Sequence, residues 1–211
     1  LETGQLQRPS ATYMPGSGRG FVSGGQHPSL TNRIQINHIP TAGNAADFGN
    51  LTSVNTAQSS VSNRTRAIVQ GGIDPSITDR IDAFEMQSTG NAFDFGDLTQ
   101  TRYNTASWSN QTRGVASGGE NPSGVSNVID YITIASTGNA TDFGDLTVAR
   151  NKLQSGSNKT RAVFAGGNTP TIVNTLDYIT IASTGNATDY GDLIKASSRL
   201  GGDSNGHGGL S

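Results

Sequence analysis

Pairs of aspartates recur along the chain at a spacing that a cation-binding turn could use. The pairs are Asp94 with Asp97, Asp142 with Asp145, and Asp189 with Asp192. Carboxylate oxygens suit Ca²⁺, but the spacing does not match a twelve-residue calcium loop and each copy supplies few ligands. The first copy reads Asp47 and Asn50, so one charge is missing. We therefore favour turn capping and pairing with Lys or Arg, and we expect neither a metal nor a cofactor.

Four arginines also recur, and together they could form a basic ring that grips an anion. They are Arg19, Arg66, Arg113 and Arg161. An unpaired buried charge is costly, so we favour a structural role for each. In that interpretation the guanidinium binds the carbonyls of a neighbouring strand or one of the repeated aspartates.

Residues suited to catalysis are scarce and scattered. His27, His38 and His207 have no carboxylate at a catalytic or metal-binding spacing, and the chain has no cysteine. A glycosidase needs a pair of carboxylates in a cleft, and nothing breaks the repeated pattern described below to provide one. We expect that the protein is not an enzyme.

Two aromatic residues stand out because the corresponding positions of the other repeats carry no tryptophan. Tyr103 and Trp108 lie in "RYNTASWSN", which we interpret as a polar loop. Aromatic rings on such a loop can stack on sugars or anchor a partner, so both residues are candidates for ligand binding. The alternative, which we weigh more heavily, is packing against the edge of a sheet.

These residues are set in an internal repeat of nearly fifty residues. Its clearest marks are four glycine pairs, namely Gly24-Gly25, Gly71-Gly72, Gly118-Gly119 and Gly166-Gly167. They are 47, 47 and 48 residues apart, and each of the four arginines stands five residues before a pair. The segment "YITIASTGNATD" occurs twice, letter for letter. A fixed period in this range is typical of propellers and solenoids.

Each repeat contains two clear candidate strands, one before and one after the glycine pair. In the third copy Ile129 and Ile132 point to opposite faces, which predicts a strand buried on both sides. The glycine pairs suit a tight turn or a close backbone approach. The repeated aromatics are expected to plug the following loop into the core; they are Phe48, Phe95, Phe143 and Tyr190.

With its Gly-Gly pairs after an apolar strand and its "IDYITI" and "LDYITI" strands, the chain resembles the kelch-type β-propeller family. The resemblance implies an all-β fold built of blades. The kelch pattern usually has a tryptophan after the tyrosine, and here the aromatic of "FGDL" or "YGDL" stands in its place. The single tryptophan, Trp108, is not repeated.

We expect one domain over residues 1–200, as a small propeller of four blades. The predicted units are 26–72, 73–119, 120–167, and a last unit 168–200 that residues 1–25 complete. Residues 201–211 are expected to form a flexible, glycine-rich tail or linker, judged from "GGDSNGHGGLS".

Charge and hydropathy argue against two kinds of partner, nucleic acid and the membrane interior. The formal net charge is −2 with no basic run, which argues against nucleic acid, and no apolar run approaches the roughly 20 residues of a membrane span. The repeats look like those of tail-fibre and appendage proteins of marine and cyanobacterial phages. This resemblance implies a virion or extracellular structural and adhesive module that binds a host surface or another virion protein within a larger assembly. A kelch-type adaptor or a propeller lectin is the alternative.

Recognition is expected on the segments that follow the glycine pairs. These are "QHPSLT", "IDPSIT", "ENPSGVS" and "NTPTIV", and each contains a proline that would stiffen a turn. We expect them to lie together on one rim of the ring. Many weak contacts there would add up through avidity.

Overall fold

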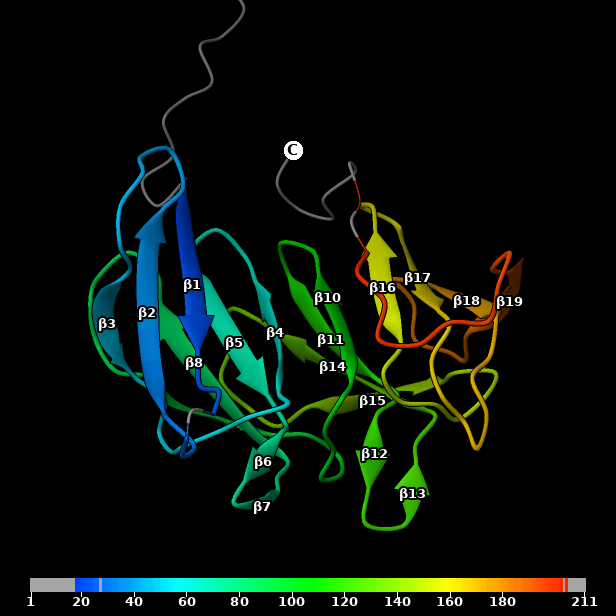
Figure 1. Cartoon of the computed structure of the whole chain (residues 1–211). Helices are drawn as coiled ribbons and strands as arrows, with labels where there is room; N and C mark the ends of the chain where they lie inside the picture. Colours follow the sequence, from blue (N-terminus) through cyan, green and yellow to red (C-terminus); the bar gives the residue numbers. More distant parts are fainter. Residues whose placement is uncertain (1–17, 27, 203, 205–211) are drawn as a thin grey trace, which may run out of the picture.

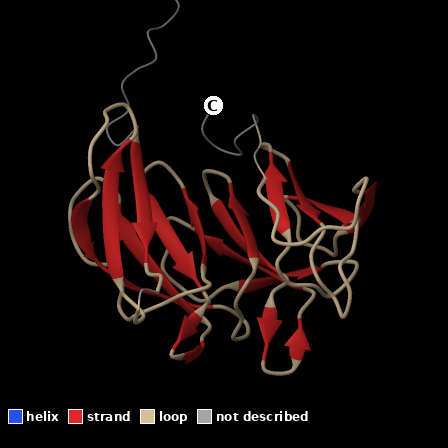
Figure 2. Cartoon of the chain, in the orientation of Figure 1, coloured by secondary structure: helices blue, strands red, loops and turns tan. Residues whose placement is uncertain are grey.

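The computed structural model describes residues 18–26, 28–202 and 204. In this part of the chain the fold is all-β and contains no helix (Figure 2). Four antiparallel sheets follow one another along the sequence and around an arc, from the first sheet at the left of Figure 1 to the fourth at the right. The all-β expectation is therefore confirmed, whereas the number of blades and the closure of a ring stay predictions.

Each sheet is a meander whose strands pair in order along the chain. The first sheet has β1 (Arg19–Ser23), β2 (Arg33–His38) and β3 (Ala46–Asn50). The second sheet has β4 (Ser59–Ser62), β5 (Arg66–Gln70), β8 (Arg80–Glu85) and β9 (Phe93–Asp97). The third sheet has β10 (Ala106–Ser109), β11 (Arg113–Ser117), β14 (Val128–Thr133) and β15 (Thr141–Asp145). The fourth sheet has β16 (Gln154–Ser157), β17 (Arg161–Ala165), β18 (Thr175–Thr180) and β19 (Thr188–Asp192).

Two short hairpins lie in connections within single sheets, one between β5 and β8 of the second sheet and one between β11 and β14 of the third. One is β6 (Ile73–Asp74) with β7 (Ser76–Ile77), and the other is β12 (Glu120–Asn121) with β13 (Gly124–Val125). Both project from the same edge of the arc, at the bottom of Figure 1.

The glycine pairs form the turns that lead into these connections. Gly118 and Gly119 have φ angles of 62° and 96°, in the region that side chains disfavour. A Cβ on Gly118 would lie 2.5 Å from the carbonyl oxygen of Arg150, and the amide of Gly119 donates to that same oxygen at 2.9 Å. The pairs therefore serve both roles expected of them, a tight turn and a close backbone approach.

The grouping of strands differs from the units expected from the sequence. β18 and β19 pair with β17, which pairs with β16, and β1 pairs with β2. The strands of the last unit, 168–200, thus pair with the strands just before them, and β1, the one strand described within residues 1–25, pairs with β2 of the first sheet. The physical reason is that strands on either side of a glycine pair are joined by a short connection and pair with each other, so every sheet spans a pair. Residues 1–17 of the expected closing segment lie outside the described residues.

The core lies between the sheets. Ile129 packs in a cluster with Phe164 and Ile179 of the fourth sheet, while Ile132, on the same strand, packs in a cluster with Ile81 and Phe95 of the second. The strand β14 is therefore buried on both faces, as the sequence predicted. Phe48, Phe95 and Phe143 are at most 4% exposed and anchor these clusters.

Two fully buried ion pairs cross the boundaries between sheets. Arg102, in the loop after β9, contacts Asp130 of β14 at 2.6 Å, and Arg150 contacts Asp177 of β18 at 2.7 Å. Burial lowers the pKa of both guanidinium groups, and the negative charge of the aspartate partner raises it in part. A threonine adds to each site: Thr99 donates its hydroxyl to Asp130, and Thr147 donates its hydroxyl to Asp177.

At the boundary between the first and second sheets the buried aspartate is balanced in a different way. Thr52 donates to Asp82 as expected, but Asn55 occupies the position of Arg102 and bonds the carbonyl of Gly71 at 2.8 Å. Arg80, on the same strand as Asp82, approaches its carboxylate at 3.4 Å. The charge of Asp82 is therefore balanced from within its own sheet.

A set of backbone hydrogen bonds closes the outer side of each boundary. Between the third and fourth sheets, Gly185 donates to the carbonyl of Phe143 at 2.7 Å and Ala187 donates to that of Asp145 at 2.7 Å. The side chain of Asn186 accepts from the amide of Asp145 at 3.0 Å. The same three bonds occur at the other boundaries, through Gly90, Asn91 and Ala92, and through Gly138, Asn139 and Ala140.

Replacement of Gly144 by alanine tests how closely the sheets approach. A Cβ there would lie 2.5 Å from the backbone of Gly185, whereas Gly191, at the same position of the fourth sheet and with φ of 128°, meets nothing within 4 Å. Both variants carry the φ strain, so the difference isolates the contact between sheets. We expect Gly144→Ala to lower the free energy of unfolding by about 1–3 kcal/mol more than Gly191→Ala, measured by urea denaturation. Equal losses would contradict the close approach.

Replacement of Arg102 by methionine tests the buried pair. It leaves the carboxylate of Asp130 buried without its cation, and we expect a loss of about 3–5 kcal/mol in the free energy of unfolding. The double variant Arg102→Met with Asp130→Asn should recover a large part of that loss. Additive losses in this double-mutant cycle would show that the two side chains do not interact.

Candidate binding surfaces

The repeated arginines reach across to the next sheet. Arg66 donates to the carbonyl of Ile134 at 2.9 Å, and Arg113 donates to that of Ile181 at 2.6 Å. Arg19 makes the equivalent bond to Met86. The interpretation that these side chains bind neighbouring carbonyls is confirmed for these three. Arg161, in the fourth sheet, stacks over the ring of Tyr178 at 4.3 Å and has no such carbonyl partner among the described residues.

The repeated aspartates cap their own turns. Asp94 accepts a hydrogen bond from the amide of Gly96 at 3.1 Å, and Asp142 accepts one from Gly144 at 3.0 Å. Burial, followed by the negative charges of Asp79 and Asp94, raises the pKa of Asp97. Within the described residues no group of three or more His, Cys, Asp or Glu side chains could hold a metal ion. No helix there is long and apolar enough to cross a membrane.

Trp108 does not lie on a loop. It lies on β10, is 6% exposed, and packs in the cluster that joins the third and fourth sheets. Its indole nitrogen is buried without a hydrogen-bond partner in the described structure. The tryptophan therefore offers no face to a ligand, and the expectation of a binding role is corrected to one in the core.

Tyr103 is half-buried and belongs to a polar cluster. Its backbone bridges that of Glu120, at the start of the hairpin β12–β13. The Glu120 carboxylate accepts a bond from the Asn151 side chain at 2.5 Å. Burial raises the pKa of Tyr103, and its hydrogen bond with Glu120 raises it further. Through its backbone bridge to Glu120, Tyr103 helps to hold the hairpin at the edge of the arc.

The sequence predicted that all four segments after the glycine pairs lie on one rim, and two of them, the hairpins β6–β7 and β12–β13, project from the same edge (Figure 1). The base of the first is held by Asp74, which pairs with Arg80 and accepts from Ser53 at 2.8 Å. Burial alone would raise the pKa of Asp74, but these hydrogen bonds lower it on balance. All four segments carry an exposed proline followed by an exposed hydroxyl residue: Pro28-Ser29, Pro75-Ser76, Pro122-Ser123 and Pro170-Thr171.

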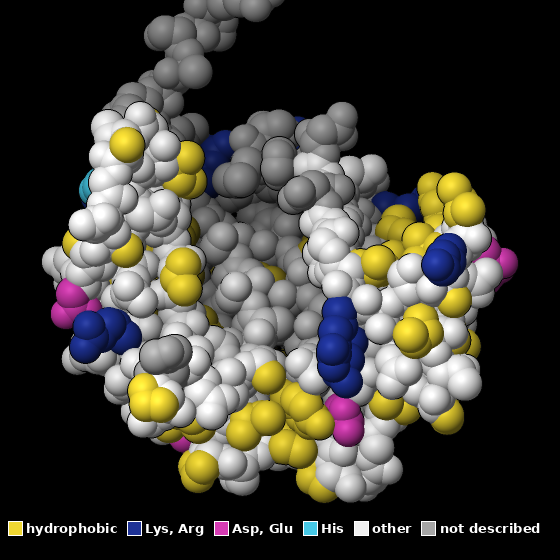
Figure 3. Space-filling model, viewed as in Figure 1, with side chains coloured by type: hydrophobic (Ala, Val, Ile, Leu, Met, Phe, Trp, Pro, Cys, Tyr) yellow, Lys and Arg dark blue, Asp and Glu magenta, His cyan; other side chains and the backbone are white. Residues whose placement is uncertain are grey.

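A second feature lies at the inner side of the arc. Ala57, Asn104, Lys152 and Arg199 occupy equivalent positions and all have φ between 52° and 56°. Their backbones are linked in series, since Asn104 donates to Ala57, Lys152 to Asn104 and Arg199 to Lys152. These residues line a cavity of about 220 Å³. Figure 3 shows a hollow between the two sides of the molecule in this view.

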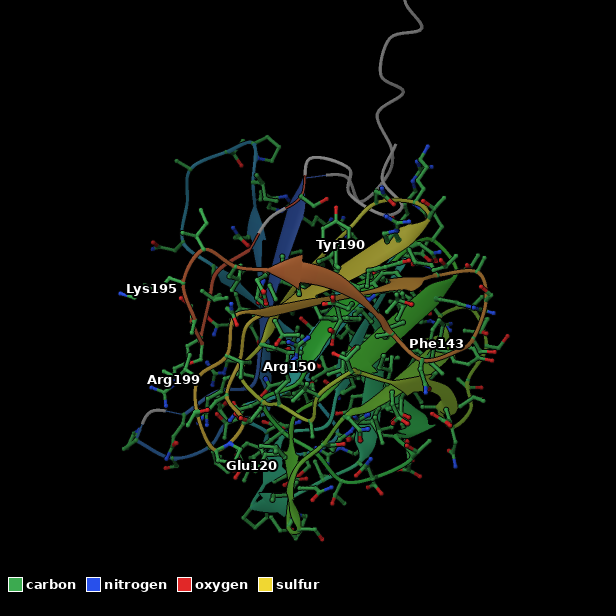
Figure 4. All side chains as sticks on the ribbon, turned by 90° about the vertical axis from the view of Figure 1, so that its right-hand side faces the viewer. Glu120, Phe143, Arg150, Tyr190, Lys195 and Arg199 are labelled. Atoms are coloured by element: carbon green, nitrogen blue, oxygen red, sulfur yellow. The ribbon has the colours of Figure 1, made fainter. Side chains whose placement is uncertain are left out.

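A cavity of about 790 Å³ lies against the fourth sheet. Its lining includes Arg161, Val163, Tyr190, Leu193 and Leu200. Tyr190 is 53% exposed, so its expected role as a core plug is wrong, although its counterparts in the other sheets are buried. Figure 4 faces this side of the molecule and labels Tyr190.

This face was missed by reasoning from the sequence, although signals for it were present. The fourth repeat has tyrosine where the others have phenylalanine, and Ile194 where they have threonine. Ser197 stands where the second and third repeats have Arg102 and Arg150. These substitutions mark a boundary that differs from the internal ones.

Replacement of Trp108 tests its reassignment to the core. Trp108→Ala should lower the free energy of unfolding by about 3–5 kcal/mol through the cavity it leaves. Trp108→Phe keeps most of the volume and removes an unpaired buried N–H, so its effect should be much smaller. In the native chain the fluorescence of this single tryptophan should be blue-shifted and should shift to the red on unfolding. A red emission from the folded chain, with no loss of stability in Trp108→Ala, would contradict the assignment.

The rim of Pro-Ser and Pro-Thr tips and the open face of the fourth sheet are thus two surfaces of the described chain on which side chains are left uncommitted. Their chemistry differs, because the rim is built of turns that expose prolines and hydroxyl residues, while the open face is a sheet with apolar side chains. No family model matches the chain, and no curated protein is significantly similar to it.

Proposed function

We propose that the chain is a non-enzymatic structural and adhesive module of a bacteriophage virion appendage, such as a tail fibre. In this proposal its sheets are blades of a kelch-like β-propeller and its rim binds a glycan of the host surface. The observation that carries the proposal is that packing between sheets and exposure at the rim involve different sets of residues. The repeated polar groups are used between sheets, and the rim tips are left facing solvent.

The arrangement of the sheets supports the propeller class. Successive sheets pack face to face, and the strands nearest the inner side are joined from sheet to sheet. Ser107 donates its hydroxyl to the carbonyl of Ser60 at 2.9 Å, and Ser155 donates to that of Ser107 at 2.9 Å. This stacking of meanders is how propellers bury both faces of each blade.

The use of charge supports a role other than catalysis. A catalytic carboxylate or base needs an uncommitted side chain near a substrate pocket. Asp130 and Asp177 are buried against Arg102 and Arg150, and Glu120 is bonded to Asn151. These three carboxylates are thus engaged in ion pairs or hydrogen bonds within the fold.

The rim supports adhesion by many weak contacts. Each tip presents a rigid proline next to a hydroxyl, and a hydroxyl can both donate to and accept from a sugar. Four similar tips on one rim, multiplied by many copies of an appendage, would give avidity without strong single sites.

Alteration of the rim tests this function. We expect beads that display the chain to adhere to host cells, and the combined variant Pro75→Ala, Ser76→Ala, Pro122→Ala and Ser123→Ala to reduce adhesion several-fold. The matched control is Ser136→Ala with Thr137→Ala, in an exposed loop at the other end of the strands of the third sheet. The control should adhere like the native chain, and both variants should unfold at nearly the native temperature.

Two results would contradict the proposal. One is unchanged adhesion of the rim variant, which would place recognition elsewhere. The other is the absence of peptides from this chain in purified phage particles analysed by mass spectrometry, which would remove it from the virion.

A further inference from the structure

We propose that the open face of the fourth sheet docks the first sheet of a second copy of this chain. The contacts would be those that already join neighbouring sheets within one chain, so that copies associate head to tail. The inference deepens the proposed function, on which it rests, because it names one partner of the module within an assembly.

The fourth sheet presents an apolar surface of the kind that is covered elsewhere in the molecule. Phe143 is 2% exposed because Ala187 of the next sheet packs in its cluster, whereas Tyr190, its counterpart, is 53% exposed. Leu193, Leu200 and Val163 lie beside it in the large cavity. A sheet face with this composition is stable when another sheet covers it.

The backbone groups of the open face are in place to receive a further sheet. At each internal boundary the outer strand offers two carbonyls and one amide, for example those of Phe143 and Asp145. On β19 the equivalent groups are the carbonyls of Tyr190 and Asp192 and the amide of Asp192. Among the described residues none of these three has a partner from another sheet. Gly191, which must allow the close approach, meets nothing within 4 Å.

The first sheet carries the complementary groups on its own uncovered side. Gly43, Asn44 and Ala45 repeat the Gly-Asn-Ala sequence that makes these three bonds at every internal boundary. All three are exposed, and no described residue bonds them. Ala45 would meet Tyr190 as Ala187 meets Phe143.

The repeated arginine gives a second, independent match. Arg113 crosses to the carbonyl of Ile181, and Arg161 is left without such an acceptor in the described chain. Ile39 occupies the position of Ile181 in the first sheet, because both amides donate to the residue just before the repeated arginine, Gly18 or Thr160. The carbonyl of Ile39 is therefore the acceptor that a docked copy would offer to Arg161, and its side chain is 69% exposed.

The charges at the two faces also fit each other. An internal boundary buries an aspartate of one sheet against a threonine, and against an arginine at the two later boundaries. The fourth sheet ends in Ile194 and Ser197 and offers neither group, so a docked aspartate would be buried unpaired. The first sheet has Gln35 at that position and brings no charge. The fourth sheet lacks the threonine and the arginine, and the first sheet lacks the aspartate. Each of these two faces therefore suits the other better than it suits an internal face, where a charge would be left unpaired.

The occupant is a second copy, because within the part of the chain that the structure describes neither face is covered and the two carry matching groups. No hydrogen bond between described residues joins the fourth sheet to the first. A contact between two different surfaces is heterologous and generates a closed ring or a filament. The interface would therefore add copies without using the rim.

Two variants that each block one face test the inference. Tyr190→Arg places a charge in the open face, and Ala45→Arg places one in the first sheet; both residues are exposed, so each variant should fold. By analytical ultracentrifugation we expect the native chain to form species of twice the monomer mass or more as its concentration rises, and each variant to stay monomeric. A mixture of the two should form a one-to-one complex and nothing larger, because each retains the face that the other lacks.

The mixture separates this interface from any other. A native chain that stays monomeric up to about 1 mM, a variant that still assembles, or a mixture that forms no complex would each overturn the inference. Ser123→Arg, on the rim, is the control and should assemble like the native chain. Adhesion of host cells is read separately through the rim variant, so the proposed function and this interface can fail independently.

Discussion

Burial of both faces of each sheet is the constraint on which the rest of the structure depends. A sheet of four short strands encloses no core of its own, so Ile129 and Ile132 must find partners in two different neighbours. Three features of the repeat serve this contact: glycines let the backbones approach, arginines cross to the next carbonyl, and buried aspartates are neutralised where sheets meet. The stability of any one sheet is therefore a property of its neighbours as much as of its own sequence.

Much of the contact between sheets could be predicted from the sequence, because the same residue types recur at the same spacing in several repeats. The glycine pairs, the buried phenylalanines and the strands covered on both sides followed from residue types at a fixed spacing. The grouping of strands did not, since a period shows how often a unit recurs but not where a sheet begins. The strands β16 to β19 form one sheet because short connections around a glycine pair join them. From the sequence alone, the same repeat can be divided into units that begin at a different strand.

Single residues were harder to place than the repeat. Trp108 has polar neighbours in the sequence and was assigned to a loop, yet it lies on a strand whose alternate residues face the next sheet. The expectation for Tyr190 was wrong in the opposite sense. Its position in the repeat predicts burial, but no described sheet follows the fourth to bury it. For Trp108 the polar neighbours also hid a strand, and in both cases the neighbouring sheet decides whether the side chain is buried, which no pattern of residue types specifies.

The boundary between the first and second sheets implies that the repeats are not interchangeable. Asp82 relies on Arg80 of its own strand, whereas Asp130 and Asp177 rely on arginines of the preceding sheet. Recombination that moved the third repeat behind the first would bring Asp130 against Asn55 and bury a carboxylate without a cation. A tandem copy of the third repeat would avoid this cost, because that repeat carries both an aspartate, Asp130, and, in Arg150, the cation for the aspartate of the sheet that follows. The first repeat, which ends in Asn55, can precede only a sheet that balances its own aspartate.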